Sequence, residues 1–344
     1  MRCPPVLKAG DDPLSNLEEV FMAVVKVGFI GSGGIANAHM NALSQIPEAK
    51  LVAFCDVQLD RAKAAVQRFG GAAYRDYRKL LEKEDLDAVY ICLPPFAHGD
   101  QELQALKKRC HLFIEKPIAL SLEKAQQINA AIKRGGAVCS VGYHWRYQDT
   151  TDRARSLLEG RTVGMVLGYW MGGMPGVAWW RRLKQSGGQM VEQTTHIFDL
   201  ARYLCGDVKR VTAAYATRAL MKVPQFDVSD VGTAVLEFKS GAVGQISTSC
   251  LLGQGYTVGL TIACHDFLLE TDGGSLRLRE PGHNEDWRAT TNPMLREDQV
   301  FIKACQTRKT GEIRSPYSDA LKTLAVTLAC NESAKKGKPI IVKS

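Results

Sequence analysis

VVKVGFIGSGGIA, at residues 24–36, is the stretch that decides the fold. Its first part, Val24–Ile30, is rich in β-branched side chains and is followed by glycine, which is typical of a buried parallel strand. The rest fits the pattern G-x-G-x-x-G/A, in which the first glycine permits a tight turn and the second lets backbone approach a pyrophosphate. The third position needs a small residue for close helix–strand packing. The residues that fill this pattern are Gly31, Ser32, Gly33, Gly34, Ile35 and Ala36.

An acidic residue follows the second predicted strand, at the position where such strand–turn–helix units contact the adenosine ribose of a dinucleotide. Asp56 directly follows the next predicted strand, Leu51–Cys55, near the expected distance of about 20 residues from the first glycine. Its carboxylate is predicted to accept hydrogen bonds from the ribose hydroxyls, which favours NAD; a solvated loop acid is the alternative. Arg61 keeps NADP open as the cofactor, because a nearby guanidinium can receive a 2′-phosphate.

The first half of the chain alternates short apolar runs with helical periods. Strand–helix alternation at this spacing predicts βαβ units and a doubly wound parallel sheet. Residues 23–147 are therefore predicted to form a Rossmann domain, preceded by an irregular extension at 1–22. Beyond the stretches already named, the predicted strands are Ala88–Leu93, His111–Ile114 and Ala137–Val141, and the predicted helices are Ile35–Ile46, Leu59–Phe69, Tyr77–Lys83, Ala97–Lys108 and Leu122–Arg134.

After residue 147 the predicted strands follow one another without helices between them. Such runs imply a mostly antiparallel sheet, so residues 148–344 are predicted to form a substrate-binding and oligomerisation α/β domain with a large open sheet. An open apolar face predicts a homodimer or homotetramer. The strands expected here are Val208–Thr217, Thr233–Phe238, Ala242–Cys250, Thr257–Cys264, Phe267–Glu270 and Ser275–Leu278, and the helices are Asp152–Leu158, Val191–Leu204, Glu297–Arg308 and Ser318–Lys335.

Composition narrows the class of protein. The 344 residues suit two domains, and the 45% hydrophobic and 23% charged residues are close to globular averages. No apolar run approaches the roughly 18 residues of a membrane helix, and no secretory signal pattern is present, so we expect a cytoplasmic protein. The ten cysteines form no CxxC pair or metal-ligand cluster, which favours a reducing compartment and no metal. The net charge of +8 is spread along the chain, which argues against nucleic acid as a partner.

Two segments carry groups suited to proton transfer. Glu115-Lys116-Pro117 follows a predicted strand at the carboxyl edge of the sheet, where doubly wound sheets bind ligands. The segment GGQMVEQTTH, at residues 187–196, places Glu192 and His196 four residues apart and hence on one face of the expected helix. An acid one turn from a histidine orients it or sets its protonation state. A surface lysine and a helix-surface Glu–His pair are the structural alternatives.

Two aromatic and cationic groups are candidates for substrate binding. Aromatic rings pack against the C–H faces of sugars, and arginine donates to hydroxyls or carboxylates, with interdomain packing as the alternative. One group follows the last Rossmann strand and comprises Tyr143, His144, Trp145, Arg146 and Tyr147, and the other comprises Trp179, Trp180 and Arg181. The remaining histidines at positions 39, 111, 265 and 283 are assigned structural or surface roles.

Together these pieces resemble the glucose–fructose oxidoreductase / inositol dehydrogenase / rhizopine-catabolism (Gfo/Idh/MocA) family over residues 23–344. The resemblance implies that Lys116 and His196 lie in a catalytic cleft. The family usually has Asp where this chain has Glu192, which bears on the substrate. The sequence segments on which the resemblance rests are residues 31–36, 93–98, 115–117, 142–147, 180–181 and 187–196. The cofactor contacts that it implies are Leu93, Pro94, His98 and Glu115, to which we add Lys116 and Arg181.

The expected reaction is the reversible oxidation of a secondary alcohol on a sugar, sugar acid or inositol. His196 would exchange the hydroxyl proton, Lys116 would hold the hydroxyl oxygen, and Glu192 would bind substrate or support His196. An NAD-dependent glycoside hydrolase acting by transient oxidation and elimination is one alternative, and a non-catalytic dinucleotide sensor is another. The residues assigned to substrate are Lys116, Tyr143, Trp145, Arg146, Trp179, Glu192 and His196.

Overall fold

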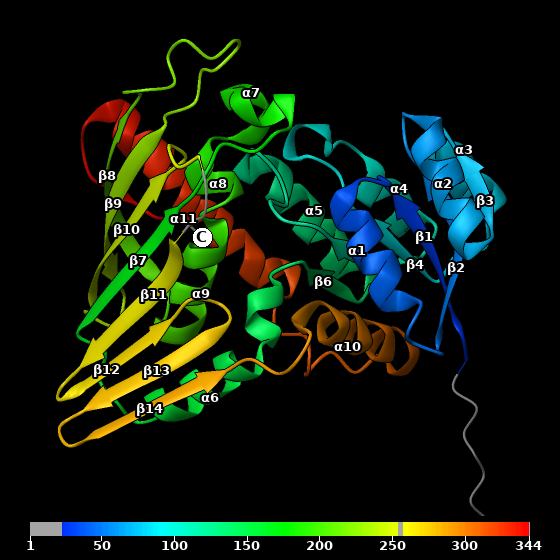
Figure 1. Cartoon of the computed structure of the whole chain (residues 1–344). Helices are drawn as coiled ribbons and strands as arrows, with labels where there is room; N and C mark the ends of the chain where they lie inside the picture. Colours follow the sequence, from blue (N-terminus) through cyan, green and yellow to red (C-terminus); the bar gives the residue numbers. More distant parts are fainter. Residues whose placement is uncertain (1–22, 254–256, 344) are drawn as a thin grey trace, which may run out of the picture.

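The computed structural model describes residues 23–253 and 257–343, so the extension expected at 1–22 lies outside the described part of the chain. Two sheets stand side by side with helices between and around them (Figure 1). The first has six strands in the order β3-β2-β1-β4-β5-β6, and the second has nine in the order β14-β13-β12-β11-β7-β10-β9-β8-β15. The predicted fold class, a Rossmann domain followed by an α/β domain with a mostly antiparallel sheet, is confirmed.

The first sheet is parallel throughout and is covered on both faces. All residues of β4 and β5 are buried, which explains why their sequences are continuous apolar runs. The short strand β3 was not predicted, because its three residues form no apolar run and are only half-buried. The strands are β1 (Val25–Ile30), β2 (Ala49–Cys55), β3 (Ala72–Tyr74), β4 (Ala88–Ile91), β5 (His111–Ile114) and β6 (Cys139–Val141). The helices are α1 (Gly34–Leu43), α2 (Leu59–Phe69), α3 (Tyr77–Lys83), η1 (Pro95–Ala97), α4 (Gln101–Lys107) and α5 (Leu122–Gly135).

The second sheet is antiparallel except where β7 and β10 pair in parallel. The strands are β7 (Met165–Met171), β8 (Val208–Ala216), β9 (Val231–Phe238), β10 (Val243–Ser249), β11 (Thr257–Cys264), β12 (Phe267–Thr271), β13 (Ser275–Glu280), β14 (His283–Arg288) and β15 (Ile340–Ile341). The other elements are η2 (His144–Tyr147), α6 (Asp149–Leu158), η3 (Ala178–Arg181), α7 (Leu183–Ser186), α8 (Gln189–Glu192), α9 (Thr195–Cys205), α10 (Pro293–Thr307) and α11 (Tyr317–Lys336).

Three strands of the second sheet were not predicted. β7 contains Gly168, which weakens its strand signal, yet a Cβ there would lie 2.6 Å from Ile197 of α9. The glycine therefore lets α9 approach the middle of the sheet. β14 has the sequence HNEDWR and no buried residue, so no apolar pattern marks it. β15 has only two residues.

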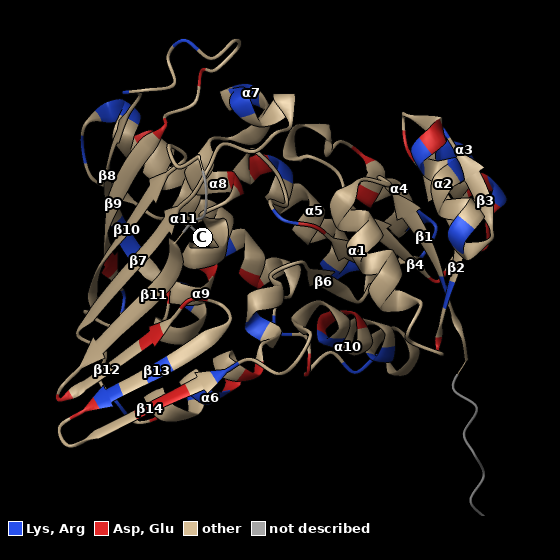
Figure 2. Cartoon of the chain, in the orientation of Figure 1, with Lys and Arg blue, Asp and Glu red and all other residues tan. Residues whose placement is uncertain are grey.

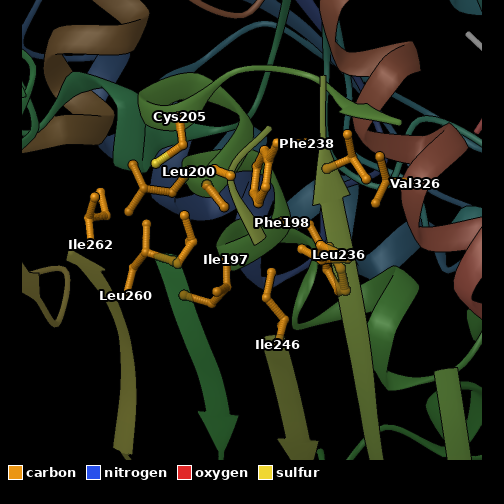
Figure 3. Packing of buried hydrophobic residues seen from close by; sticks show 14 of the residues in the cluster. Ile197, Phe198, Leu200, Cys205, Leu236, Phe238, Ile246, Leu260, Ile262 and Val326 are labelled. Atoms are coloured by element: carbon orange, nitrogen blue, oxygen red, sulfur yellow. The ribbon is translucent and has the colours of Figure 1, made fainter. Parts of the chain in front are cut away.

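The core of the second domain lies between the sheet and the helices α9 and α11. Ile197 and Phe198 of α9 point toward Ile246 and Leu236 of the sheet (Figure 3). The opposite face carries several exposed apolar side chains, which alternate with the buried ones along β7, β9 and β10: Met165, Leu167, Val235 and Val243.

Part of the segment that follows β14 returns to the first domain. Phe301 and Ile302 of α10 share a hydrophobic cluster with Phe29 and Tyr90 of the first sheet, and α10 lies beside that domain in Figure 1. Tyr317, at the start of α11, also packs in a cluster of that domain. Residues after position 147 therefore do not all fold onto the second sheet. None of the helices in residues 23–253 and 257–343 has the length and apolar character needed to cross a membrane.

Lysine and arginine residues are distributed along the elements of both domains and are mixed with acidic ones (Figure 2). The net charge of +8 is therefore not gathered into one basic stripe of the kind that binds nucleic acid.

Candidate active site

The glycine turn between β1 and α1 is open where phosphates would approach. Gly31 has φ +94°, and a Cβ there would lie 2.2 Å from the carbonyl oxygen of Cys92, so the position requires glycine. A Cβ at Gly33 or Gly34 would meet no atom within 4 Å. The free N–H groups and positive dipole end of α1 begin at the same place. The turn thus fits the pyrophosphate of a dinucleotide.

Asp56 lies beside this turn, as predicted from its position after β2. Its Oδ2 accepts a hydrogen bond from the Ser32 N–H at 3.0 Å, and its Oδ1 accepts from the Gln58 N–H at 2.8 Å. Each carboxylate oxygen keeps a second lone pair for a ribose hydroxyl. Arg61 Nη1 lies 4.0 Å from Oδ2, and its side chain is 53% exposed. An arginine is therefore within reach of the same ribose.

The segment after β4 carries three of the expected cofactor contacts, Leu93, Pro94 and His98. Leu93 lies against the glycine turn, because a Cβ at Gly31 would be 3.3 Å from Leu93 Cδ2. Pro94 is extended and precedes η1. The side chain of His98 is 1% exposed, and its Nδ1 lies 2.6 Å from Glu102 Oε1 within α4. Its Nε2 is buried and has no hydrogen-bond partner among the described residues, and the expected cofactor contact of His98 stays a prediction.

Glu115 follows β5 and is held from two sides. Its Oε1 lies 3.0 Å from His39 Nε2, and its Oε2 accepts a hydrogen bond from the Lys116 N–H at 3.0 Å. Gly142 leaves the space that the carboxylate occupies, because a Cβ there would be 2.2 Å from Glu115 Oε1. Burial alone would raise the pKa of Glu115, but the hydrogen bond and charge of His39 lower it below its usual value. The expected contact of this side chain with a cofactor stays a prediction.

Lys116, Glu192 and Trp180 form one connected group at the carboxyl edge of the first sheet. Lys116 Nζ donates to the backbone oxygen and to Oε1 of Glu192, both at 3.2 Å. The other carboxylate oxygen of Glu192 accepts from Trp180 Nε1 at 2.8 Å. The side chains of Lys116 and Glu192 are 16% and 13% exposed. The acid therefore positions the lysine ammonium while both side chains remain partly exposed.

The expected pairing of Glu192 with His196 on one helix face is wrong. The segment forms two short helices instead of one, because α8 ends at Glu192 and α9 begins at Thr195. At the junction, the Thr194 N–H donates to the Gln189 backbone oxygen, and its hydroxyl donates to Thr248 Oγ1 of β10 at 2.8 Å. This anchoring to the sheet breaks the helical repeat, so Glu192 turns to Lys116.

His196 is buried in an aromatic enclosure. Its ring lies parallel to those of Trp145 and Trp170, at centroid distances of 6.1 and 6.0 Å. His144 and Tyr143 contact it edge-on at 5.1 and 6.0 Å. Within the described residues, Nδ1 of His196 is buried and has no hydrogen-bond partner.

Charge and burial keep this imidazole neutral. Burial, and then the positive charge of Lys116, lowers the pKa of His196 well below its usual value. We expected a neighbouring carboxylate to raise that pKa, and the structure corrects this expectation because Glu192 is paired with the lysine instead. Lys116, Glu192 and His196 are nonetheless brought to one place.

The aromatic candidates divide between the site and its surroundings. The Tyr143 hydroxyl lies 2.9 Å from Thr195 Oγ1 at the start of α9. Trp179 is half-buried, and its ring lies 6.4 Å from that of Phe96 of η1. The Nε of Arg181 is buried without a partner among the described residues. Trp170 was not predicted as a site residue, because the strand that carries it was not recognised.

Arg146 has a structural position. It is 1% exposed, and its Nε and Nη2 donate to the two carboxylate oxygens of Asp199 at 2.6 and 2.5 Å. Nη2 also lies 2.7 Å from Asp319 Oδ2 of α11. The expectation that Arg146 donates to a substrate is therefore contradicted. Its guanidinium instead links η2 to α9 and α11 through the carboxylates of Asp199 and Asp319. In residues 23–253 and 257–343, no three His, Cys, Asp or Glu side chains are grouped so as to hold a metal ion.

Comparison with known proteins identifies the same two units. Residues 25–143 match the model of the oxidoreductase family with an NAD-binding Rossmann fold, and residues 151–269 match the GFO/IDH/MocA C-terminal domain. The chain is 30% identical over 236 residues to myo-inositol 2-dehydrogenase of Thermotoga maritima, covering 67% of this chain and 70% of that protein. It is 30% identical over 354 aligned positions to D-apiose dehydrogenase of Paraburkholderia graminis, covering 93% and 90%.

A solved structure agrees in fold. The crystal structure of the WlbA dehydrogenase from Bordetella pertussis, in complex with NADH and UDP-GlcNAcA, superposes with a TM-score of 0.81 at 23% identity. The match covers 93% of this chain and 99% of that one. The two family models and the relatives that are 30% identical show that the chain belongs to the Gfo/Idh/MocA family of NAD-binding oxidoreductases.

Proposed function

We propose that this oxidoreductase reversibly oxidises a secondary alcohol of a sugar, sugar acid or inositol, with Lys116 and His196 at the reacting atoms. The observation that carries the proposal is the meeting of a lysine ammonium, an acid and a neutral buried histidine at the carboxyl edge of the first sheet. Doubly wound sheets bind ligands at this edge. The relatives named for inositol and apiose support a polyol substrate.

His196 is suited to accept the hydroxyl proton. Because its pKa is lowered, the imidazole is neutral near pH 7 and has a lone pair available. The ammonium of Lys116 donates a hydrogen bond to the hydroxyl oxygen and stabilises the negative charge that grows there. Glu192 keeps the ammonium in place. NAD, when bound, supplies the acceptor for the hydride that leaves the same carbon.

The aromatic side chains define where the ring of the substrate would lie. Trp145 stacks on His196, and the ring of Trp179 lies 6.4 Å from that of Phe96. Flat apolar faces near a polar group suit a ring with C–H faces and peripheral hydroxyls. We propose these two tryptophans as substrate contacts, with Tyr143 supporting them through Thr195.

The finer cofactor choice is NAD rather than NADP. The carboxylate of Asp56 can accept from a free ribose hydroxyl, and it would repel a 2′-phosphate. Arg61 is the residue that would favour NADP. We propose that the cofactor is held by the turn Gly31–Ala36, together with Asp56, Leu93, Pro94, His98, Glu115, Lys116 and Arg181.

The assembly and the compartment are also proposals. Met165, Leu167, Val235 and Val243 are each more than 40% exposed on the open face of the second sheet, and an apolar face of this kind is typical of an oligomer contact. We propose a homodimer or homotetramer formed with this face. All nine cysteines in the described residues are free, which supports a reducing compartment such as the cytoplasm.

The test is a screen of polyols, sugars and sugar acids with NAD and with NADP, followed by His196→Ala on the substrate found. Loss of the proton acceptor should lower kcat by about 10²–10⁴, while NADH binding measured by fluorescence titration stays near the wild-type value. Wild-type turnover in the variant would remove His196 from the chemistry. Binding of NADH without turnover of any substrate would favour the dinucleotide-sensor alternative.

A further inference from the structure

His39 of α1 is placed between two carboxylates in the interior of the first domain. Its Nδ1 lies 2.9 and 3.0 Å from the two oxygens of Asp298 in α10. Its Nε2 lies 3.0 Å from Oε1 of Glu115. The imidazole is fully buried, and the side chains of Asp298 and Glu115 are 0% and 4% exposed. The site described above does not use this histidine, and it was assigned a structural or surface role.

The chain of hydrogen bonds continues at both ends. The Tyr90 hydroxyl of β4 donates to Asp298 Oδ1 at 3.0 Å. At the other end, Glu115 Oε2 accepts from the backbone N–H of Lys116. The ring of Phe113 contacts His39 edge-on at 4.7 Å, so the imidazole has no room to rotate. A continuous path therefore runs from α10 through α1 to the backbone of Lys116.

Each ring nitrogen of His39 faces a carboxylate oxygen. Ionised carboxylates only accept hydrogen bonds, so an imidazole between two of them satisfies both when it carries both protons. Burial by itself would lower the pKa of His39, but the charges and hydrogen bonds of Asp298 and Glu115 raise it well above its usual value. One cation then holds two buried anions in fixed positions.

We propose that His39 is a positioning residue for Lys116, which fixes the Glu115 carboxylate and through it the backbone from which the catalytic lysine extends. The same helix, α1, begins at the glycine turn, so one rigid element would set both the phosphate site and the lysine. The catalytic part of this inference rests on the proposed function. The part that concerns how Lys116 is held in place does not depend on the proposed function.

The central variant is His39→Asn, which keeps a polar side chain but is too short to reach both carboxylates. His39→Gln retains a longer amide and serves as the partial rescue. His111→Asn is the matched control, because His111 is also buried, at 3% exposed against 0% for His39. It lies at the start of β5, the strand that Glu115 follows, and accepts a hydrogen bond from the Val138 N–H. Urea unfolding first establishes that each variant is folded.

Two measurements then separate positioning from general stability. The first is the rate at which an amine-acylating reagent labels Lys116, read by peptide mass spectrometry relative to Lys63, whose side chain is 60% exposed. We expect the ratio to rise several-fold in His39→Asn, less in His39→Gln and not in His111→Asn. The second is steady-state kinetics, in which His39→Asn should lower kcat at least about tenfold with a smaller change in KM.

The two readouts keep the inference separate from the proposed function. An unchanged Lys116 labelling ratio in folded His39→Asn would overturn the positioning role, even if no substrate had been found for the wild type. Equal losses of kcat in His39→Asn and His111→Asn would also overturn it, since both would then reflect stability alone. A raised labelling ratio together with the kcat loss, confined to the His39 variants, supports it.

Discussion

At the scale of single residues, the ionisable groups of the site are controlled by which partner each one has. Glu192 is bonded to Lys116 and Trp180, and His196 is enclosed by aromatic rings. The carboxylate therefore stabilises a cation at the lysine. Burial and the neighbouring positive charge of Lys116 keep the histidine neutral.

The pH dependence of alcohol oxidation follows from this arrangement. His196 must be unprotonated to accept a proton, so activity rises as pH increases through its pKa. That pKa lies well below 6.5, because burial and the charge of Lys116 both lower it. We expect the acidic limb of kcat/KM to lie below pH 6.5 in a wild-type pH profile. Glu192→Gln should leave the limb near that position while lowering kcat, and a limb well above pH 6.5 would contradict the assignment.

Asp56 governs the choice of dinucleotide. Replacing it with Ser removes the charge that opposes a 2′-phosphate and leaves Arg61 beside the ribose. We expect Asp56→Ser to lower the ratio of kcat/KM for NAD over NADP by at least about tenfold, or about 1.4 kcal/mol. Arg61→Ala is the control and should change the ratio in the opposite direction. Equal efficiency of both cofactors in the wild type would refute the role of Asp56.

At the scale of elements, the turn before α8 places Glu192. Gly187 and Gly188 have φ of +77° and +86°, and Asn331 of α11 donates to the Gly187 backbone oxygen at 2.7 Å. A Cβ at Gly187 would lie 2.9 Å from both Leu120 and Val191 side chains. The turn is therefore packed between the loop after Lys116 and the first residues of α8.

Gly187→Ala should disturb the site as well as the turn. The added methyl pushes against Leu120 and Val191, so we expect kcat to fall by about tenfold or more with little change in NADH affinity. Gly206→Ala is the matched control, because Gly206 also has a positive φ of +98° but a Cβ there would meet no atom within 4 Å. The control should lose about 1 kcal/mol of stability and keep wild-type kcat. Equal kcat in the two variants would mean that the packing of this turn does not position Glu192.

At the scale of the whole molecule, buried ion pairs connect the two domains. Arg146 of η2 pairs with Asp199 of α9 and Asp319 of α11. We expect Arg146→Met to lower the free energy of unfolding by about 3–5 kcal/mol in urea, because two carboxylates lose their shared cation. KM for the substrate should change little in the folded fraction. A raised KM at unchanged stability would restore the substrate-binding role that the structure argues against.

The open sheet face gives a prediction about assembly. Leu167 is 41% exposed on the central strand β7, so a lysine there would place a charge inside a contact between copies. Light scattering should show an oligomer for the wild type and smaller particles for Leu167→Lys. Met221→Lys is the control, since Met221 is 68% exposed and lies between β8 and β9, outside this face. A monomeric wild type would exclude the proposed contact.

The sequence alone determined the features that depend on neighbouring residues. Continuous apolar runs and glycine positions marked the buried parallel strands and the turn of the first domain, because burial on both faces and a positive φ leave local signals. The position of Lys116 at the carboxyl edge followed from the parallel topology. The family resemblance then placed His196 in the same cleft.

Only the tertiary structure decided which side chains pair. The break between α8 and α9 depends on a hydrogen bond from the Thr194 hydroxyl to Thr248 of β10. Gly168 of β7 is needed because α9 packs directly against it. His39 meets Asp298 across 259 positions of the chain. The periodicity of a sequence predicts whether a side chain is buried, but it does not predict which residues that side chain contacts. These contacts determine the protonation state and the role of a buried polar group.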